Sequence, residues 1–272
     1  MDNNDTVNFD VQKNPEEPDM QDELTHSDKM TGVFTEPEAT FKQTALFPPH
    51  TSDWLLPLLL VIVVSIISNI ILMSNSETSF LIKQKQVEQI EKQEAELQKK
   101  VQNGELTSDQ AEQTSEAMRK GIDMMSGPLG MVISSVSIIV ARFVFFFIFV
   151  LIFYLLAKYA LKGEGTFTSA MTAYGLPQYI LAVQALLATI FAVLLGKLFM
   201  DTSVASFIGA DKKELSGFLL SFIDPISIWF YAVLSIALAK MFKAASNTNY
   251  YFVGFGVWIV TGFILYALGW NF

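Results

Sequence analysis

Five long apolar blocks constrain this chain more than any other feature of its sequence. They cover about residues 54–73, 129–157, 174–199, 218–242 and 250–270. A helix that crosses a bilayer needs about 20 mostly apolar residues, and each block reaches that length. The blocks predict an all-α polytopic membrane protein, a bundle of five transmembrane helices, rather than a soluble domain with buried helices.

Aromatic residues mark the ends of several blocks. Trp54 begins the first, Tyr250 and Tyr251 begin the fifth, and Trp270 lies near the end of the chain. Such residues are enriched at headgroup depth. The first block follows a 53-residue acidic segment and lacks a basic n-region, so we interpret it as a membrane span and not as a cleavable signal peptide. Five spans would place the two termini on opposite sides of the membrane.

The net negative charge of the chain comes entirely from its N-terminal tail. Residues 1–53 hold 12 Asp/Glu and 3 Lys, whereas the remaining residues hold 15 acids and 15 bases. No basic surface is left that would indicate nucleic-acid binding. Residues 1–32 are polar and acidic with few large apolar side chains, and we predict that they are disordered.

Residues 33–50 are more apolar than the tail before them. Phe34, Phe41 and Leu46 recur at spacings that suit a short amphipathic helix, and Pro48-Pro49 would end it. We expect this segment to lie in the membrane interface with these three side chains toward lipid headgroups.

Residues 77–125 form the only long charged segment between apolar blocks. Their first half consists of strong helix formers, Asn103-Gly104 gives a stop, and Thr107 begins a second helix with a capping-box pattern. We predict a charged αα-hairpin. The expected apolar seam of its first helix, which Glu94 interrupts, consists of Phe80, Val87, Ile90, Leu97 and Val101. The hairpin either packs only on itself or is a coiled-coil arm for a protein partner or a second copy.

Polar residues inside the apolar blocks are candidates for function. Asn69, Arg142, Gln184 and Asp224 lie in the first four blocks, and we predict that they form a polar cluster with an Arg142–Asp224 ion pair at its centre. The alternative is that Arg142 extends to the interface and Asp224 caps a helix. Asp224-Pro225 favours the cap, because Asp suits the N-cap position and Pro suits the first helical turn.

The residues that most catalytic and metal sites require are scarce. Cysteine is absent, and His26 and His50 both precede the first apolar block. Asp224 is the one aspartate well placed within the membrane, which argues against an aspartyl protease. Neither a glycine-rich phosphate loop nor an HExxH motif occurs. We therefore expect no catalytic residue, no metal site and no cofactor, and we interpret the chain as a non-enzyme.

Several short motifs together resemble the Yip1 domain family, in its bacterial form. The segment before the first block carries Pro37 and Phe41, and Trp54 begins the block. The third block begins with Tyr174, Gly175 and Pro177, and the fourth continues through Asp224, Pro225 and Trp229. The resemblance covers about residues 33–73 and 127–270.

This resemblance implies a non-enzymatic five-helix membrane protein that organises membrane or recruits partners. It also implies a cytosolic N-terminus and an external C-terminus, here in a bacterial cytoplasmic (inner) membrane. Basic residues near the spans number five on the N-terminal side and seven on the other, which weakly favours the opposite orientation. The tail lacks the GTPase-binding motif of eukaryotic relatives. A transporter of ions or small solutes built on Arg142 and Asp224, and an accessory subunit that docks through the hairpin, remain as alternatives.

Overall fold

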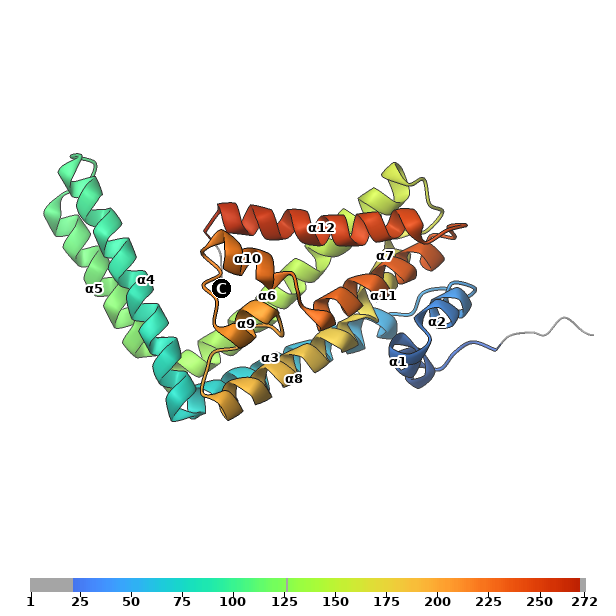
Figure 1. The fold of residues 1–272 in the computed structure, drawn as a ribbon, viewed down its shortest axis with the longest axis horizontal. Helices are drawn as coiled ribbons and strands as arrows, with labels where there is room; N and C mark the ends of the chain where they lie inside the picture. Colours follow the sequence, from blue (N-terminus) through green and yellow to red (C-terminus); the bar gives the residue numbers. More distant parts are fainter. Residues whose placement is uncertain (1–21, 126, 270–272) are drawn as a thin grey trace, which may run out of the picture.

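The computed structural model describes residues 22–125 and 127–269, and within these ranges it contains helices and no strands (Figure 1). Four segments are long and apolar enough to cross a membrane: Ser52–Ser74, Leu129–Ala160, Phe167–Leu195 and Thr248–Ala267. The pair Leu215–Ser221 and Pro225–Met241, which is bent by 54°, is also long and apolar enough when taken together, and it gives a fifth span if the pair is counted as one. The prediction of an all-α polytopic membrane protein is confirmed.

The spanning helices pack against one another in a bundle. Helix α3 (Ser52–Ser74) lies along α8 (Gln178–Leu195), and α6 (Pro128–Leu155) packs on α3. Helix α11 (Pro225–Met241) contacts α7 (Phe167–Gly175), α8 and α12 (Thr248–Ala267). The aromatic ring of Tyr174 lies within 6.0 Å of the rings of Phe146, Phe149, Phe153 and Phe230. The core is therefore densest where α6, α7 and α11 meet.

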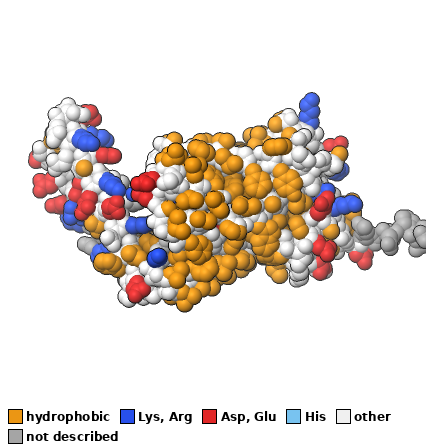
Figure 2. Space-filling view, viewed as in Figure 1, with side chains coloured by type: hydrophobic (Ala, Val, Ile, Leu, Met, Phe, Trp, Pro, Cys, Tyr) orange, Lys and Arg blue, Asp and Glu red, His pale blue; other side chains and the backbone are white. Residues whose placement is uncertain are grey.

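The outside of the bundle is apolar between two charged ends. Large hydrophobic side chains remain exposed along α3, α6 and α12, for example Val63, Phe145 and Ile264. Figure 2 shows this apolar surface, with charged side chains gathered on the projecting arm at one end and beside the N-terminal helices at the other. Such a wide exposed apolar surface suits contact with lipid tails.

A two-helix arm of α4 (Ser76–Gln102) and α5 (Ser108–Met125) projects from the bundle (Figure 1). The predicted hairpin is present, but its seam differs from the predicted one. Phe80 and Val87 are exposed, while Glu94 lies on the seam, where it receives two hydrogen bonds of 2.8 Å from Arg119 and a further one from Ser115. Heptad spacing of apolar residues does not indicate the position of Glu94 on the seam, because there a bidentate ion pair with Arg119 replaces an apolar contact.

The N-terminal segment differs most from prediction. Helix α1 (His26–Thr35) begins within the range predicted to be disordered, so that prediction is wrong for residues 26–32; residues 1–21 lie outside the described part. Helix α2 (Pro37–Thr44) follows directly. Phe41 is completely buried against the bundle, and Phe34 packs on Trp229. These two side chains therefore do not face lipid headgroups, whereas Leu46 is exposed.

Two of the predicted spans are interrupted. The third consists of α7 and α8, with the break at Leu176-Pro177, so it begins before residue 174. In the fourth, α10 (Leu215–Ser221) is separated from α11 by a turn that ends at Asp224-Pro225. The short helix α9 (Val204–Ile208) precedes α10, and the π-helical turn η1 (Leu156–Ala160) extends α6. Pro177 ends the hydrogen-bonding pattern of α7 because it lacks an N–H donor, whereas Pro225 occupies the first turn of α11, where no donor is needed.

Candidate functional site

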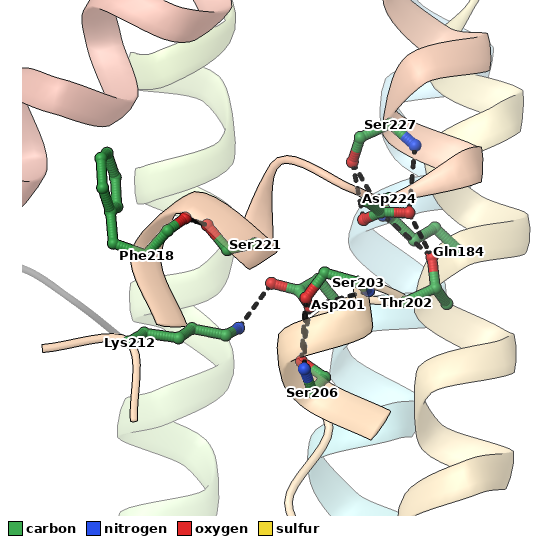
Figure 3. A network of polar contacts seen from close by, with 10 residues as sticks. All are labelled: Gln184, Asp201, Thr202, Ser203, Ser206, Lys212, Phe218, Ser221, Asp224 and Ser227. Atoms are coloured by element: carbon green, nitrogen blue, oxygen red, sulfur yellow. Dashed lines mark hydrogen bonds and ion pairs between the residues drawn. The ribbon is translucent and has the colours of Figure 1, made fainter. Parts of the chain in front are cut away.

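Asp224 is the centre of a network of polar contacts at the break before α11 (Figure 3). Its side chain is 1% exposed. Oδ1 accepts hydrogen bonds from the backbone N–H groups of Ile226 (3.1 Å) and Ser227 (3.3 Å), which caps the helix, and from Thr202 Oγ1 (2.6 Å). Oδ2 accepts from Gln184 Nε2 (2.6 Å) and from Ser227 Oγ (2.9 Å). Five donors thus compensate a carboxylate that has no cationic partner in the described chain.

A second aspartate, Asp201, fixes the segment that leads into this break (Figure 3). Its Oδ1 accepts hydrogen bonds of 2.6 Å from the hydroxyls of Ser203 and Ser206, and its Oδ2 lies 2.6 Å from Lys212 Nζ. Partial burial raises the pKa of the Asp201 carboxyl, but the hydrogen bonds from Lys212, Ser203 and Ser206 outweigh burial, and the pKa lies below its ordinary value. The carboxylate therefore stays charged and holds the Lys212 ammonium.

Arg142 belongs to a different part of the bundle. Its guanidinium donates a hydrogen bond of 3.2 Å to Ser65 Oγ on α3. On the same helix pair, Ser134 Oγ of α6 donates to Asn69 Oδ1 of α3 (3.1 Å). Both contacts lie between α3 and α6, whereas the contacts of Asp224 come from α8, α11 and the segment around Thr202.

The structure therefore divides the predicted four-residue cluster into two pairs. Gln184 and Asp224 are in direct contact, and Asn69 and Arg142 share the α3–α6 interface. No Arg142–Asp224 ion pair forms between these two described residues, so that prediction is wrong. Sequence position indicates the depth of a residue along the membrane normal but not the direction in which its side chain points, and here the two side chains face different neighbours.

A third polar cluster, at the N-terminal end of the bundle, was missed by the sequence analysis. Lys29 of α1 and Asp53 of α3 are 3% and 1% exposed, and Lys29 Nζ lies 3.1 Å from Asp53 Oδ2. His26 Nδ1 lies 3.5 Å from Asp53 Oδ1, and His26 Nε2 is 2.7 Å from the hydroxyl of Tyr179. The available signal was the Thr25-x-x-Asp28 spacing, which forms a capping box at the start of α1.

Most of the motif residues singled out in the sequence assemble near that same end. A Cβ at Gly175 would lie 2.4 Å from Trp54 Cα, so only glycine allows α7 to approach α3 this closely. Trp229 of α11 contacts Phe34 of α1 with 5.5 Å between ring centroids. Pro37 is the first residue of α2, on which the buried Phe41 also lies. Phe34 and Phe41 thus join the N-terminal helices to the membrane bundle, while Gly175 brings α7 onto α3 beside them.

The described residues offer no group of three or more His, Asp or Glu side chains that could hold a metal ion. Within each polar cluster, side chains are joined by hydrogen bonds or ion pairs. Their arrangement supports helix packing at the break before α11, at the α3–α6 interface and at the N-terminal end of the bundle.

Comparison with known proteins gives one informative match. Neither the curated proteins nor the solved structures compared with the chain gave a match. The Yip1 domain, described by a family model, matches residues 31–268, which is nearly the whole chain and includes the arm. The chain therefore belongs to the Yip1 domain family.

Proposed function

We propose that this protein is a non-enzymatic membrane scaffold that recruits a partner protein, or a second copy of itself, through the α4–α5 arm. The observation that carries the proposal is the outward apolar face of the arm. Phe80 and Val87, seven residues apart on α4, are 67% and 39% exposed. Apolar side chains at heptad spacing on a charged helix are typical of a surface that packs against another helix.

The interior of the arm supports the same interpretation. Ile90, Leu97 and Val101 are only half-buried between α4 and α5, and Thr78, at the base, is the one fully buried residue of α4. Two helices by themselves bury little apolar surface, so an additional helix would add to the stability of the arm.

The bundle supports a structural role for the membrane part. Both oxygens of Asp224 already accept hydrogen bonds from neutral donors, which suits a helix cap better than a site for proton relay. The close contact at Gly175 holds α7 against α3, and the buried Phe41 fixes the N-terminal helix α2 to the bundle. We propose a bacterial cytoplasmic membrane as the location, with the N-terminus in the cytosol and the arm outside.

Site-specific photo-crosslinking tests this function. A photoreactive amino acid at Val87 is expected to give a discrete crosslinked product in native membranes, and the same group at the exposed Gln113 of α5 serves as the control. A product of twice the chain mass identifies self-association, and a product of another mass identifies a protein partner. The proposal is rejected if Val87 gives no product beyond that seen at Gln113.

Transport of an ion or small solute is the second candidate, and the 54° break before α11 favours it. Transporters often place their binding sites at such interrupted helices. Substrate-dependent flux in proteoliposomes that is lost in Asp224→Asn would support this candidate. Retained crosslinking at Val87 with no flux for any tested ion would leave the scaffold as the better description.

A further inference from the structure

Arg142 lies in the middle of the longest apolar helix and has no carboxylate partner among the residues that the structure describes. It is 14 residues from the first residue of α6, or about 20 Å at 1.5 Å per residue. Its guanidinium carries five N–H donors, and Ser65 Oγ receives one of them. Among residues 22–125 and 127–269, no carboxylate forms an ion pair with it. A cation at this depth is costly unless an anion or several acceptors compensate it.

The guanidinium lines a cavity of about 410 Å³ between α3, α6 and α7. Ser65, Tyr174 and Gln178 contribute the other polar groups, and aromatic side chains of α6 contribute much of the remaining wall. Phe145, which also lines the cavity, is 52% exposed on the outside of the bundle. One residue of the cavity wall thus also faces the outside of the bundle, where acyl chains would lie.

A second cavity of about 310 Å³ continues from the first toward the arm. The two cavities share Ser65 and Ile138. Polar residues follow the second cavity from Ser68 and Asn69 of α3 to Gln86 of α4, at the base of the arm. A row of polar residues thus connects the arm-side end of the bundle with Arg142, and Ser134 of α6 and Thr189 of α8 add hydroxyl groups to the otherwise apolar remaining walls.

We propose that this groove binds the headgroup of an anionic phospholipid, with the phosphate at Arg142 and the acyl chains in the surrounding bilayer. A guanidinium binds phosphate through paired N–H donors, and the phosphate in turn supplies the negative charge that Arg142 otherwise lacks. The hydroxyl and amide groups between Gln86 and Ser65 would hydrogen bond a headgroup drawn below the interface. The proposal is independent of whether the arm recruits a partner.

Lipid retention by the purified full-length protein tests the proposal. Native mass spectrometry after exchange into mixed micelles of detergent with phosphatidylglycerol, and separately with phosphatidylcholine, measures bound lipid. The wild type is expected to retain phosphatidylglycerol in preference to phosphatidylcholine. Arg142→Gln is expected to retain about tenfold less phosphatidylglycerol than the wild type, because it removes a charge-assisted contact. Arg119→Gln, which removes an arginine of the exposed arm, is the matched control and should bind as the wild type does.

Thermal unfolding separates loss of binding from loss of folding. Without added lipid, Arg142→Gln should unfold at the same or a higher temperature than the wild type, because the variant lacks the uncompensated charge. Addition of phosphatidylglycerol should stabilise the wild type and not the variant. If Arg142→Gln does not fold, Ala141→Trp, which fills the cavity wall, replaces it with the same expected loss of lipid.

Three outcomes would overturn the proposal. They are equal retention of phosphatidylglycerol and phosphatidylcholine by the wild type, unchanged retention by a folded Arg142→Gln or Ala141→Trp, and an equal thermal shift with oleate. The last result would assign the groove to any anionic amphiphile and not to a phospholipid. Inorganic phosphate alone should give no shift, because it lacks the acyl chains that partition into the bilayer.

Discussion

Lys29 and Asp53 form an ion pair, with 3.1 Å between Nζ and Oδ2, although both side chains are almost completely buried. The pair joins α1 to the second residue of α3, where the first membrane span begins. Glu23 and His26 contribute further contacts, at 3.4 Å from Lys29 Nζ and 3.5 Å from Asp53 Oδ1. The residues before the membrane are thereby attached to the bundle rather than left as a separate tail.

Removal of one partner of this pair should be strongly destabilising. In Lys29→Met the carboxylate of Asp53 stays buried without its cation, and the expected loss is about 3–5 kcal/mol. The free energy of unfolding, measured by denaturant titration in detergent micelles, gives the value. The double variant Lys29→Met/Asp53→Leu should recover much of the loss, because it leaves no buried charge.

The control for this pair is Lys42→Met, since Lys42 is exposed on the neighbouring helix. That variant should change the free energy of unfolding by no more than about 0.5 kcal/mol. If Lys29→Met proves as mild as Lys42→Met, the buried pair does not hold α1 on the bundle.

Asp224 should tolerate replacement by Asn better than by Ala. Asn keeps the N-cap to Ile226 and Ser227 and an oxygen for Thr202, and its new amide N–H can donate to the Gln184 oxygen once the Gln184 amide turns over. Ala leaves Gln184 without its acceptor at Oδ2 and removes the cap, for an expected loss of about 2–4 kcal/mol. Thermal unfolding of both variants in micelles checks the order. Equal stability of Asp224→Ala and the wild type would show that the network does not stabilise the break.

The apolar blocks predicted the spans because a bilayer imposes length and composition directly. The direction in which each polar side chain faces is not imposed in this way. Asn69 and Arg142 share one interface, and Gln184 and Asp224 another, because of helix rotations that a single sequence does not encode locally. Sequence position alone could therefore place these residues in the membrane but could not pair them.

The first turns of α1, at residues 26–32, escaped prediction for a different reason. They belong to an acidic and polar stretch of the chain, and such a composition is typical of disorder. Val33 and Phe41 are nevertheless completely buried, because the bundle supplies the apolar surface that the segment itself lacks. A short segment with few apolar residues can fold when each of them reaches an existing core.

Glu94 of the arm should titrate far below an ordinary glutamate. Two hydrogen bonds from Arg119 and one from Ser115 lower its pKa from 4.5 to about 2. Because the folded value is below the unfolded one, its contribution to helix pairing is complete above about pH 4.5 and is lost as the pH falls toward 2. Carboxyl carbon chemical shifts of the labelled full-length protein in micelles measure the pKa.

The matched variants for this titration are Arg119→Gln and Lys120→Gln. The first should raise the pKa of Glu94 toward its ordinary value, because Arg119 is the main cause of the shift. The second removes a neighbouring cation that pairs with Glu116 instead, and should leave the pKa of Glu94 nearly unchanged. A pKa of Glu94 near 4.5 in the wild type would contradict the inter-helix pair.

The sidedness of the bundle is testable because the chain contains no cysteine. Single cysteines at Ser27 of α1, Lys162 between η1 and α7, and Gln102 at the tip of the arm all occupy exposed positions. The first two lie at the N-terminal end of the bundle and the third at the other (Figure 1). In intact cells, an impermeant maleimide should therefore either label both Ser27→Cys and Lys162→Cys and not Gln102→Cys, or label Gln102→Cys and neither of the other two.

Intact and lysed cells distinguish the two orientations. The proposed orientation predicts that only Gln102→Cys is labelled in intact cells and that all three are labelled after lysis. Labelling of Ser27→Cys and Lys162→Cys alone would reverse the orientation and place the arm in the cytosol, where its partner should then be sought. Labelling of all three in intact cells would contradict the spanning arrangement, because α1 and the α4–α5 arm lie at opposite ends of the apolar surface (Figures 1 and 2). The charged ends of the molecule can reach water together only if that surface lies within a bilayer that separates them.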